Sequence, residues 1–172
     1  MKKTDKIIII DDFFDSNMFE KIKHHVTTKL YFTPRFLEHS TEKNKDSYYG
    51  ARFQFKNDPS LLDTFIQQTK EKFNIKIKKV HGDSGLDIRN LDRFLPHEDS
   101  HAGKLNLLVM INGPTAVTNG TVFYTDNELD IHIGFRENRA VLFPSNKFHS
   151  PHASNIPNLV RHTATLFIQE FE

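Results

Sequence analysis

The last strand-like stretch of the chain, residues 159–168 (LVRHTATLFI), alternates between two kinds of side chain. Successive residues of a β-strand point to opposite faces of a sheet, so every second side chain shares a face. One face is mostly apolar and suits packing against another layer: His162, Ala164, Leu166 and Ile168. The other face carries an arginine, two hydroxyls and an aromatic ring: Arg161, Thr163, Thr165 and Phe167. This polar face must meet either solvent or a polar barrel interior, and the stretch alone leaves both open.

Two helices and a series of short strands are expected before this stretch. Asp15 or Ser16 can cap the first helix and Pro59-Ser60 starts the second, each ahead of apolar residues at three- and four-residue spacing. The polar segment 33–50 between them is expected to be a long loop. Strands are expected at 7–10, 75–80, 86–95, 105–111, 121–125, 129–134, 139–143 and 159–168. This order predicts an α+β, mainly β fold, an antiparallel barrel or sandwich with N-terminal helices packed on one sheet.

Composition narrows the class of protein. A chain of 172 residues suits one domain, and the absence of cysteine means that any metal must be held by imidazole and carboxylate. The net charge is +1, and lysine and arginine are spread along the chain, so the sequence shows no basic cluster that would indicate binding to nucleic acid or a membrane surface. The apolar run near the N-terminus is too short for a signal peptide or a membrane span, so a cytoplasmic protein is expected.

A cluster of titratable residues opens one expected strand, in 94–112 (FLPHEDSHAGKLNLLVMIN). His97 and Asp99 are separated by one residue, so on an extended backbone both side chains project to the same side, and Glu98 projects to the other. Such a strand end can supply two ligands of a metal site whose third ligand is a histidine from a distant strand. Two histidines and one carboxylate on one face of an octahedron are the arrangement of non-haem Fe(II) oxygenases.

Spacing alone does not single out this pair, because the chain also contains HGD at 81–83 and the reversed order DIH at 130–132. Any such triplet can be an ordinary surface turn. His97 and Asp99 are favoured because an apolar strand follows them, and because a later apolar strand ends in a Pro-Ser turn and His149.

Five motifs follow one another in the second half of the chain. They are His-x-Asp at 97–99, LLVMIN at 107–112, Asn-Gly-Thr-x-Phe-Tyr at 119–124, Asn-Arg-x-x-x-Phe-Pro-Ser-x-x-x-His at 138–149 and Arg-x-Thr at 161–163. Over residues 86–169 this order resembles the 2-oxoglutarate/Fe(II)-dependent oxygenases, most closely the prolyl-4-hydroxylase-like branch and its bacterial and phage relatives. The resemblance implies a double-stranded β-helix, a cupin-like jelly-roll with the metal inside one mouth. It also implies a single oxygenase-like domain over 1–172, with helical support in 1–74 and the jelly-roll core in 75–172.

The resemblance also implies roles for individual residues. His97, Asp99 and His149 match the iron ligands of that family, Arg161 matches the residue that pairs with the distal carboxylate of 2-oxoglutarate, and Thr163 matches its hydroxyl companion. An arginine suits this task because its fork binds a carboxylate through two parallel hydrogen bonds. The implied enzyme is a dioxygenase of the hydroxylase type that uses Fe(II), 2-oxoglutarate and O2. It would oxidise a C–H bond of a small-molecule or peptidyl substrate and release succinate and CO2.

The chain departs from the family pattern at two places. The usual Gly-Gly before the threonine is Asn119-Gly120, and Met110 stands near the place of an aromatic hydroxyl. Asn106 has the same strand parity as Met110. It either supplies the lost hydrogen bond to the cosubstrate or is an ordinary polar residue at a strand end.

Several alternatives stay open at this level. His152 competes with His149 as the distal ligand, although His149 has the family's usual interval from the Pro-Ser turn. His101 is expected near the mouth of the site, and Arg52 either reaches a substrate carboxylate or phosphate or lies on the surface. Two other functions compete: a cupin-like metal protein, such as an isomerase or sensor, which needs no Arg161, and a non-catalytic jelly-roll binding module.

Overall fold

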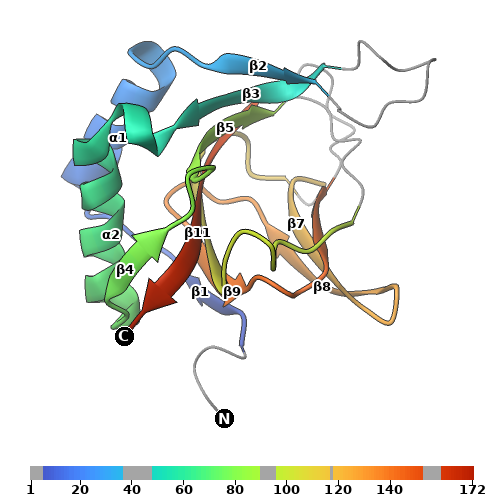
Figure 1. The fold of residues 1–172 in the computed structure, drawn as a ribbon. Coiled ribbons are helices and arrows are strands. Elements are labelled where there is room, and N and C mark those ends of the chain that lie inside the picture. Colours follow the sequence, from blue (N-terminus) through green and yellow to red (C-terminus); the bar gives the residue numbers. More distant parts are fainter. Residues whose placement is uncertain (1–5, 37–47, 90–95, 117, 153–159) are drawn as a thin grey trace.

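The computed structural model describes residues 6–36, 48–89, 96–116, 118–152 and 160–172. Its described strands form two antiparallel sheets, and two helices lie against one face of the larger sheet (Figure 1). The predicted mainly β architecture with helices on one sheet is thus confirmed.

The larger sheet is built around β11 (Arg161–Phe171). This strand pairs with β6 (Leu105–Asn112) on one edge, and with β5 (Gly85–Arg89) and β4 (Ile77–Val80) on the other. The order of the sheet is β1-β9-β6-β11-β5-β3-β2, with β4 beside the C-terminal part of β11. The strands not yet placed are β1 (Ile8–Ile10), β2 (Thr33–Phe36), β3 (Tyr48–Gln54) and β9 (Ala140–Pro144).

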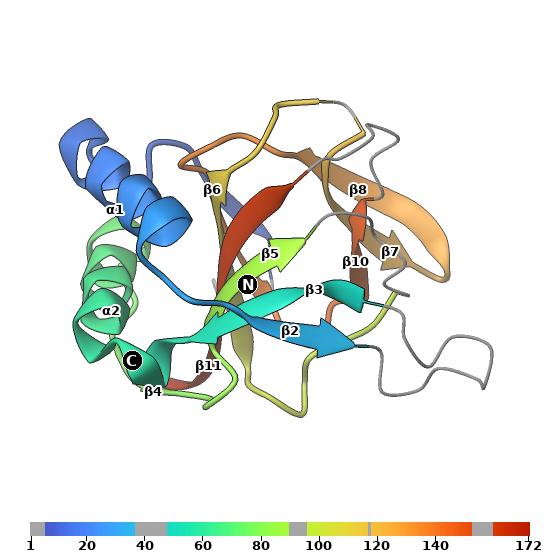
Figure 2. The same ribbon diagram turned by 90° about the horizontal axis from the view of Figure 1, so that it is seen from above.

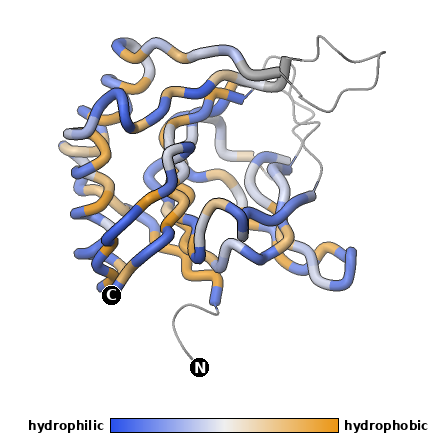
Figure 3. Tube along the Cα trace, viewed as in Figure 1, coloured by the Kyte–Doolittle hydropathy of each residue, from blue (hydrophilic) through white to orange (hydrophobic). Residues whose placement is uncertain are grey.

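The smaller sheet has the order β10-β7-β8 and lies on the side away from the helices (Figure 2). Its strands are β7 (Gly120–Thr125), β8 (Glu128–Gly134) and β10 (His149–His152). The turn between β7 and β8 places Asp126 and Asn127 at positive φ, which short polar residues tolerate, and Figure 3 shows its tip as hydrophilic. A second apolar cluster draws on both sheets: Met110, Phe123, Ile133, Phe135, Val141 and Phe143.

Both expected helices are present and begin at the expected residues. In α1 (Ser16–Thr28) the side chain of Asp15 accepts a hydrogen bond from Met18 N at 2.9 Å, and in α2 (Pro59–Phe73) Asp58 accepts one from Leu61 N at 3.0 Å. A short 3₁₀ helix, η3 (Phe55–Asn57), precedes α2. These side-chain acceptors satisfy backbone N–H groups that have no partner inside a helix. Neither described helix is long and apolar enough to cross a membrane.

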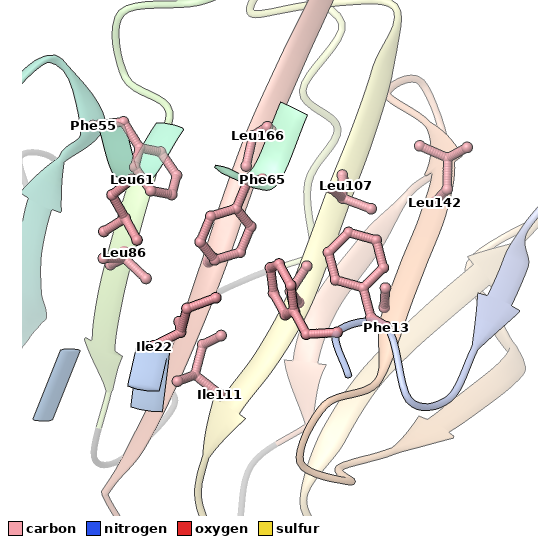
Figure 4. Packing of buried hydrophobic residues seen from close by; sticks show 14 of the residues in the cluster. Phe13, Ile22, Phe55, Leu61, Phe65, Leu86, Leu107, Ile111, Leu142 and Leu166 are labelled. Atoms are coloured by element: carbon pink, nitrogen blue, oxygen red, sulfur yellow. The ribbon is translucent and has the colours of Figure 1, made fainter. Parts of the chain in front are cut away.

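The main core lies between the helices and one face of the larger sheet. Figure 4 shows Ile22 of α1 and Phe65 of α2 beside Leu107 and Leu166 of the central strands. Ala164, Leu166 and Ile168 are all fully buried there, so the predicted apolar face of β11 is the face that the helices cover. His162, on the same face of β11, is also buried, with its ring centroid 6.1 Å from that of Phe32.

Two parts of the secondary structure differ from the prediction. Segment 33–50 is not all loop, because β2 and β3 pair there, while 37–47 lies outside the described residues. Strand β10 was also missed, because HSPH at 149–152 has neither apolar alternation nor strong strand formers. Its place in the sheet comes from pairing with β7. Of the predicted strand at 86–95, the described part ends at Arg89.

Candidate metal and cosubstrate site

His97, Asp99 and His149 (the triad) come together although half of the jelly-roll separates them in sequence. The backbones of His97 and His149 form a two-way bridge, with N–H···O distances of 2.9 and 2.8 Å. Asp99 is held by its own backbone N–H, which donates to Ser145 O at 2.7 Å. One ligating atom from each triad residue lies within 4.8 Å of the other two. The convergence expected from the sequence is therefore present, and it arises from backbone pairing.

The donor set fits a divalent transition metal. Ligands at right angles around a metal, with bonds of about 2.0–2.2 Å, lie about 3 Å apart. In the structure His149 Nε2 is 3.4 Å from Asp99 Oδ2, and His97 Nε2 is 3.8 Å from Asp99 Oδ1. Sub-ångström adjustments of side chains would bring these atoms to ligand spacing, with Fe(II) among the metals that imidazole and carboxylate suit.

The ring of His149 is oriented for ligation by its other nitrogen. Its Nδ1 lies 2.9 Å from the carbonyl oxygen of Lys147, which can only accept, so Nδ1 carries the proton. When the ring is neutral, Nε2 is the nitrogen with the lone pair and can bind a metal beside Asp99, because a hydrogen bond from the other ring nitrogen to a carbonyl orients metal-bound histidines in this way. Phe143 and Phe123 pack against the ring, with centroids 5.0 and 5.9 Å away.

Asp99 is kept as a carboxylate although it is buried. Burial alone would raise its pKa, but His149 when protonated, through a hydrogen bond and its charge, the charge of His97 when protonated, and a hydrogen bond from Asn106 together lower the pKa. The Asn106 contact is short, with Nδ2 donating to Asp99 Oδ2 at 2.6 Å. An ionised carboxylate between two imidazoles is the state that ligates a cation.

The triad opens into a cavity of about 560 Å³ between the two sheets. The polar face of β11 lines this cavity from Arg161 to Phe167, which settles that the face meets the interior of the jelly-roll and not solvent. All six residues that the sequence assigned to metal or cosubstrate binding line the same cavity: His97, Asp99, Asn106, His149, Arg161 and Thr163.

Arg161 is only 5% exposed, and its guanidinium is positioned by the start of β7. Its Nη1 donates to Asn119 Oδ1 at 2.9 Å and to the carbonyl oxygen of Gly120 at 3.0 Å. Asn119 is itself fully buried and donates from Nδ2 to Pro114 O at 2.8 Å. Sequence reasoning noticed Asn119 only as a departure from Gly-Gly and gave it no role. The unusual polar residue beside the threonine motif was the available signal.

Arg52 is not a surface residue, and its guanidinium is already bound by other groups of the protein. Its Nε and Nη2 donate to the two oxygens of Asp87 at 2.8 and 2.7 Å, and its Nη1 donates to the carbonyl oxygen of Asp83. Both side chains of this ion pair are almost completely buried, and Arg52 also lines the cavity. Asp87 was missed because a lone aspartate in a strand has many possible roles without its cross-strand partner.

The competing histidines lie elsewhere. His152 does not line the cavity, and its ring centroid is 4.6 Å from that of His132 of the DIH triplet. In the HGD triplet, His81 Nδ1 and Asp83 Oδ2 are 3.9 Å apart on a partly exposed turn. His101 is exposed and lines the cavity, as expected for a residue at the mouth. Among the described residues, the triad is the cluster of three or more such side chains whose spacing suits a metal.

Comparison of the coordinates with solved structures identifies the fold. The chain superimposes on an oxidoreductase of the 2OG-Fe(II) oxygenase family from Burkholderia pseudomallei with a TM-score of 0.67 and 9% identity, covering 95% of this chain and 85% of that one. The fold is that of the 2-oxoglutarate/Fe(II) oxygenases. The resemblance drawn from the motifs is thus confirmed for the architecture, a double-stranded β-helix.

Two further solved structures share this fold. A prolyl hydroxylase from Trichoplax adhaerens, in complex with a peptide fragment of the hypoxia inducible factor oxygen degradation domain, gives a TM-score of 0.61 at 14% identity over 96% of this chain and 84% of that one. The epimerase SnoN, in complex with Fe3+, alpha ketoglutarate and nogalamycin RO, gives a TM-score of 0.62 at 8% identity over 98% of this chain and 83% of that one. No family model and no curated protein sequence matches the chain. The prolyl-4-hydroxylase-like branch stays a prediction.

Proposed function

We propose that this protein is a 2-oxoglutarate- and Fe(II)-dependent dioxygenase that hydroxylates a C–H bond of its substrate and releases succinate and CO2. One observation carries the proposal: the triad and the buried guanidinium of Arg161 share a single cavity. A metal site alone would suit many jelly-roll proteins, but a buried arginine on the same cavity wall suits a dicarboxylate that also reaches the metal.

His97, Asp99 and His149 would hold the iron, since their ligating atoms converge and the Nδ1 of His149 is already bonded to a carbonyl. When bound, Fe(II) with 2-oxoglutarate and O2 supplies the oxidising chemistry that no side chain of the protein can provide. Two imidazoles and one carboxylate would fill only part of the metal's coordination sphere and would leave positions for cosubstrate and O2.

Arg161 and Thr163 would anchor the distal carboxylate of 2-oxoglutarate. Asn119 and the Gly120 carbonyl hold one side of the guanidinium, so little side-chain entropy is lost when a carboxylate binds. Thr163 follows on the same face of β11 and also lines the cavity, which places a hydroxyl beside the arginine. Charge-assisted pairing in a buried site gives both affinity and a fixed orientation of the cosubstrate.

The remaining walls would keep the reaction away from bulk water. Leu108, Met110, Phe135 and Phe143 line the cavity, and aromatic rings enclose His149. A largely apolar wall around a few polar groups is typical of ligand sites and suppresses side reactions of a strong oxidant. The solved neighbours bind a peptide in one case and nogalamycin RO in another, so we propose a peptidyl or small-molecule substrate without choosing between them.

The test is to add Fe(II) and then 2-oxoglutarate to the metal-free protein without oxygen. A weak visible charge-transfer band, present in wild type and absent in His97→Ala, is the expected result. Uncoupled turnover of 2-oxoglutarate to succinate, followed with a panel of metabolites and peptides, would then find the substrate. Iron binding without the band or turnover would favour a cupin-like metal protein, and absence of iron binding would favour a binding module.

A further inference from the structure

Asn106 occupies the middle of the sheet directly behind the metal site. It lies on β6, where its Cα partners are Phe167 on β11 and Phe143 on β9, and it is fully buried. Its Nδ2 donates to Oδ2 of Asp99 at 2.6 Å. A buried amide at the centre of a sheet cannot swing away, so this contact is part of the fold.

The other end of the same amide shows that the contact is not incidental. Oδ1 of Asn106 is buried and has no hydrogen-bond partner among the described residues, and the side chain lines the cavity. Turning the amide over would place Oδ1 2.6 Å from a carboxylate oxygen, where two acceptors repel. The charge of Asp99 therefore dictates the orientation of Asn106 and leaves Oδ1 as the end of the amide without a partner among the described residues.

We propose that Asn106 is a positioning residue that fixes the rotation of the Asp99 carboxylate and thereby sets the affinity of the site for its metal. The hydrogen bond engages Oδ2, which leaves Oδ1, on the side of His97, as the less engaged oxygen. Hydrogen bonds of this kind orient metal ligands, and their loss typically weakens metal binding by 10- to 100-fold. The inference rests on the proposed metal site but needs no catalytic turnover.

This role differs from the cosubstrate contact predicted from the sequence. The carboxylates and the keto oxygen of 2-oxoglutarate are all hydrogen-bond acceptors, and Oδ1, the atom of Asn106 that Asp99 leaves unused, is also an acceptor. The donor end of the amide is already used by Asp99. Oδ1 therefore suits a donor such as water or a hydroxyl, and anchoring of the cosubstrate depends on Arg161 and Thr163.

The test compares Asn106→Leu, which keeps the size of the side chain but removes the donor, with a matched control. Asn112→Leu makes the same change on the same strand, where Asn112 Nδ2 lies 3.3 Å from His162 Nδ1 and away from the site. Co(II) affinity is measured by calorimetry on the metal-free proteins, the Co(II) ligand-field spectrum is recorded, and the Kd of 2-oxoglutarate is measured at saturating Co(II).

Asn106→Leu should bind Co(II) about 10- to 100-fold more weakly, with altered ligand-field bands, while its Kd for 2-oxoglutarate at saturating metal stays within about threefold of wild type. Asn112→Leu should match wild type in all three measurements. Unchanged Co(II) affinity and bands in Asn106→Leu would overturn the proposal, and so would a loss of 2-oxoglutarate affinity larger than the loss of metal affinity.

Two further comparisons keep the result interpretable. If Asn106→Leu does not fold, as judged by circular dichroism, Asn106→Ala removes the same donor without adding bulk and is held to the same criteria. Wild type that binds Co(II) but no 2-oxoglutarate would refute the proposed function and leave the role of Asn106 to be decided by metal affinity alone. Failure of the two ideas can thus be told apart.

Discussion

Replacing Arg161 with alanine separates a 2-oxoglutarate oxygenase from any other metal-binding jelly-roll. Arg161 is 5% exposed and lines the same cavity as the triad, and its guanidinium donates to Asn119 and to the carbonyl oxygen of Gly120 at the start of β7, whereas the candidate metal ligands are His97, Asp99 and His149. Arg161→Ala should therefore leave metal affinity nearly intact while it sharply weakens binding of the cosubstrate.

The size of the effect follows from the burial of the arginine. Water cannot screen a charge pair at this depth, so loss of the pair costs about 2–5 kcal/mol, which corresponds to an affinity lower by about thirtyfold to several thousandfold. Arg161→Lys should recover only part of this loss. Lysine keeps the charge, and its ammonium can still donate to Asn119 or Gly120, but it lacks the planar fork that binds a carboxylate through two parallel bonds.

The assay is a titration of 2-oxoglutarate into the Fe(II)-loaded protein without oxygen, followed by the charge-transfer band and by calorimetry. Arg136→Ala is the control, because Arg136 is about half exposed and pairs with Asp11 away from the cavity. It should bind the cosubstrate as wild type does. Equal 2-oxoglutarate affinity in Arg161→Ala and wild type would refute the anchoring role and with it the oxygenase proposal.

Three further predictions concern the stability that holds the site together. Leu166→Ala should lower the free energy of unfolding by about 2–5 kcal/mol in urea titrations, because the side chain is fully buried under the helices. A loss of metal-binding free energy as large as this loss of stability would contradict the assignment of this face of β11 to the core alone. Asp87→Ala should lower the free energy of unfolding by about 3–5 kcal/mol in the same titrations, because it leaves the Arg52 charge buried, and adding Arg52→Met should restore much of that stability. No recovery of stability in the double variant would mean that the two residues do not act as a pair. Burial lowers the pKa of His162 below its ordinary 6.5. As the pH falls through about 6.5, His162 is therefore protonated in the unfolded chain before it is protonated in the folded protein, and this difference lowers the free energy of unfolding. His162→Gln should lose less stability than wild type between pH 7.5 and 5.5, and parallel pH profiles for the two proteins would argue against the shift.

Local patterns in the sequence determined the two faces of β11, the starts of both helices and one pair of candidate ligands. The alternation in 159–168 predicted which residues of β11 face the helices and which face the other way, because strand geometry has a period of two. The caps and apolar spacing located the starts of both helices for the same local reason. The separation of His97 and Asp99 by one residue likewise placed two candidate ligands on one side of the chain.

Contacts between distant parts of the chain were decided only by the tertiary structure. Whether the polar face of β11 met solvent or a cavity depended on the smaller sheet across from it, whose strand β10 has no strong pattern of its own. The bridge that joins His97 to His149, the pairing of Arg52 with Asp87 across β3 and β5, and the hydrogen bond from Asn106 to Asp99 all depend on strand register. Register is set by burial of the whole core, because a shift of one residue would turn every apolar side chain of a strand to the wrong face. The sequence therefore named the candidate ligands, and the packing of the two sheets determined their distances and their partners.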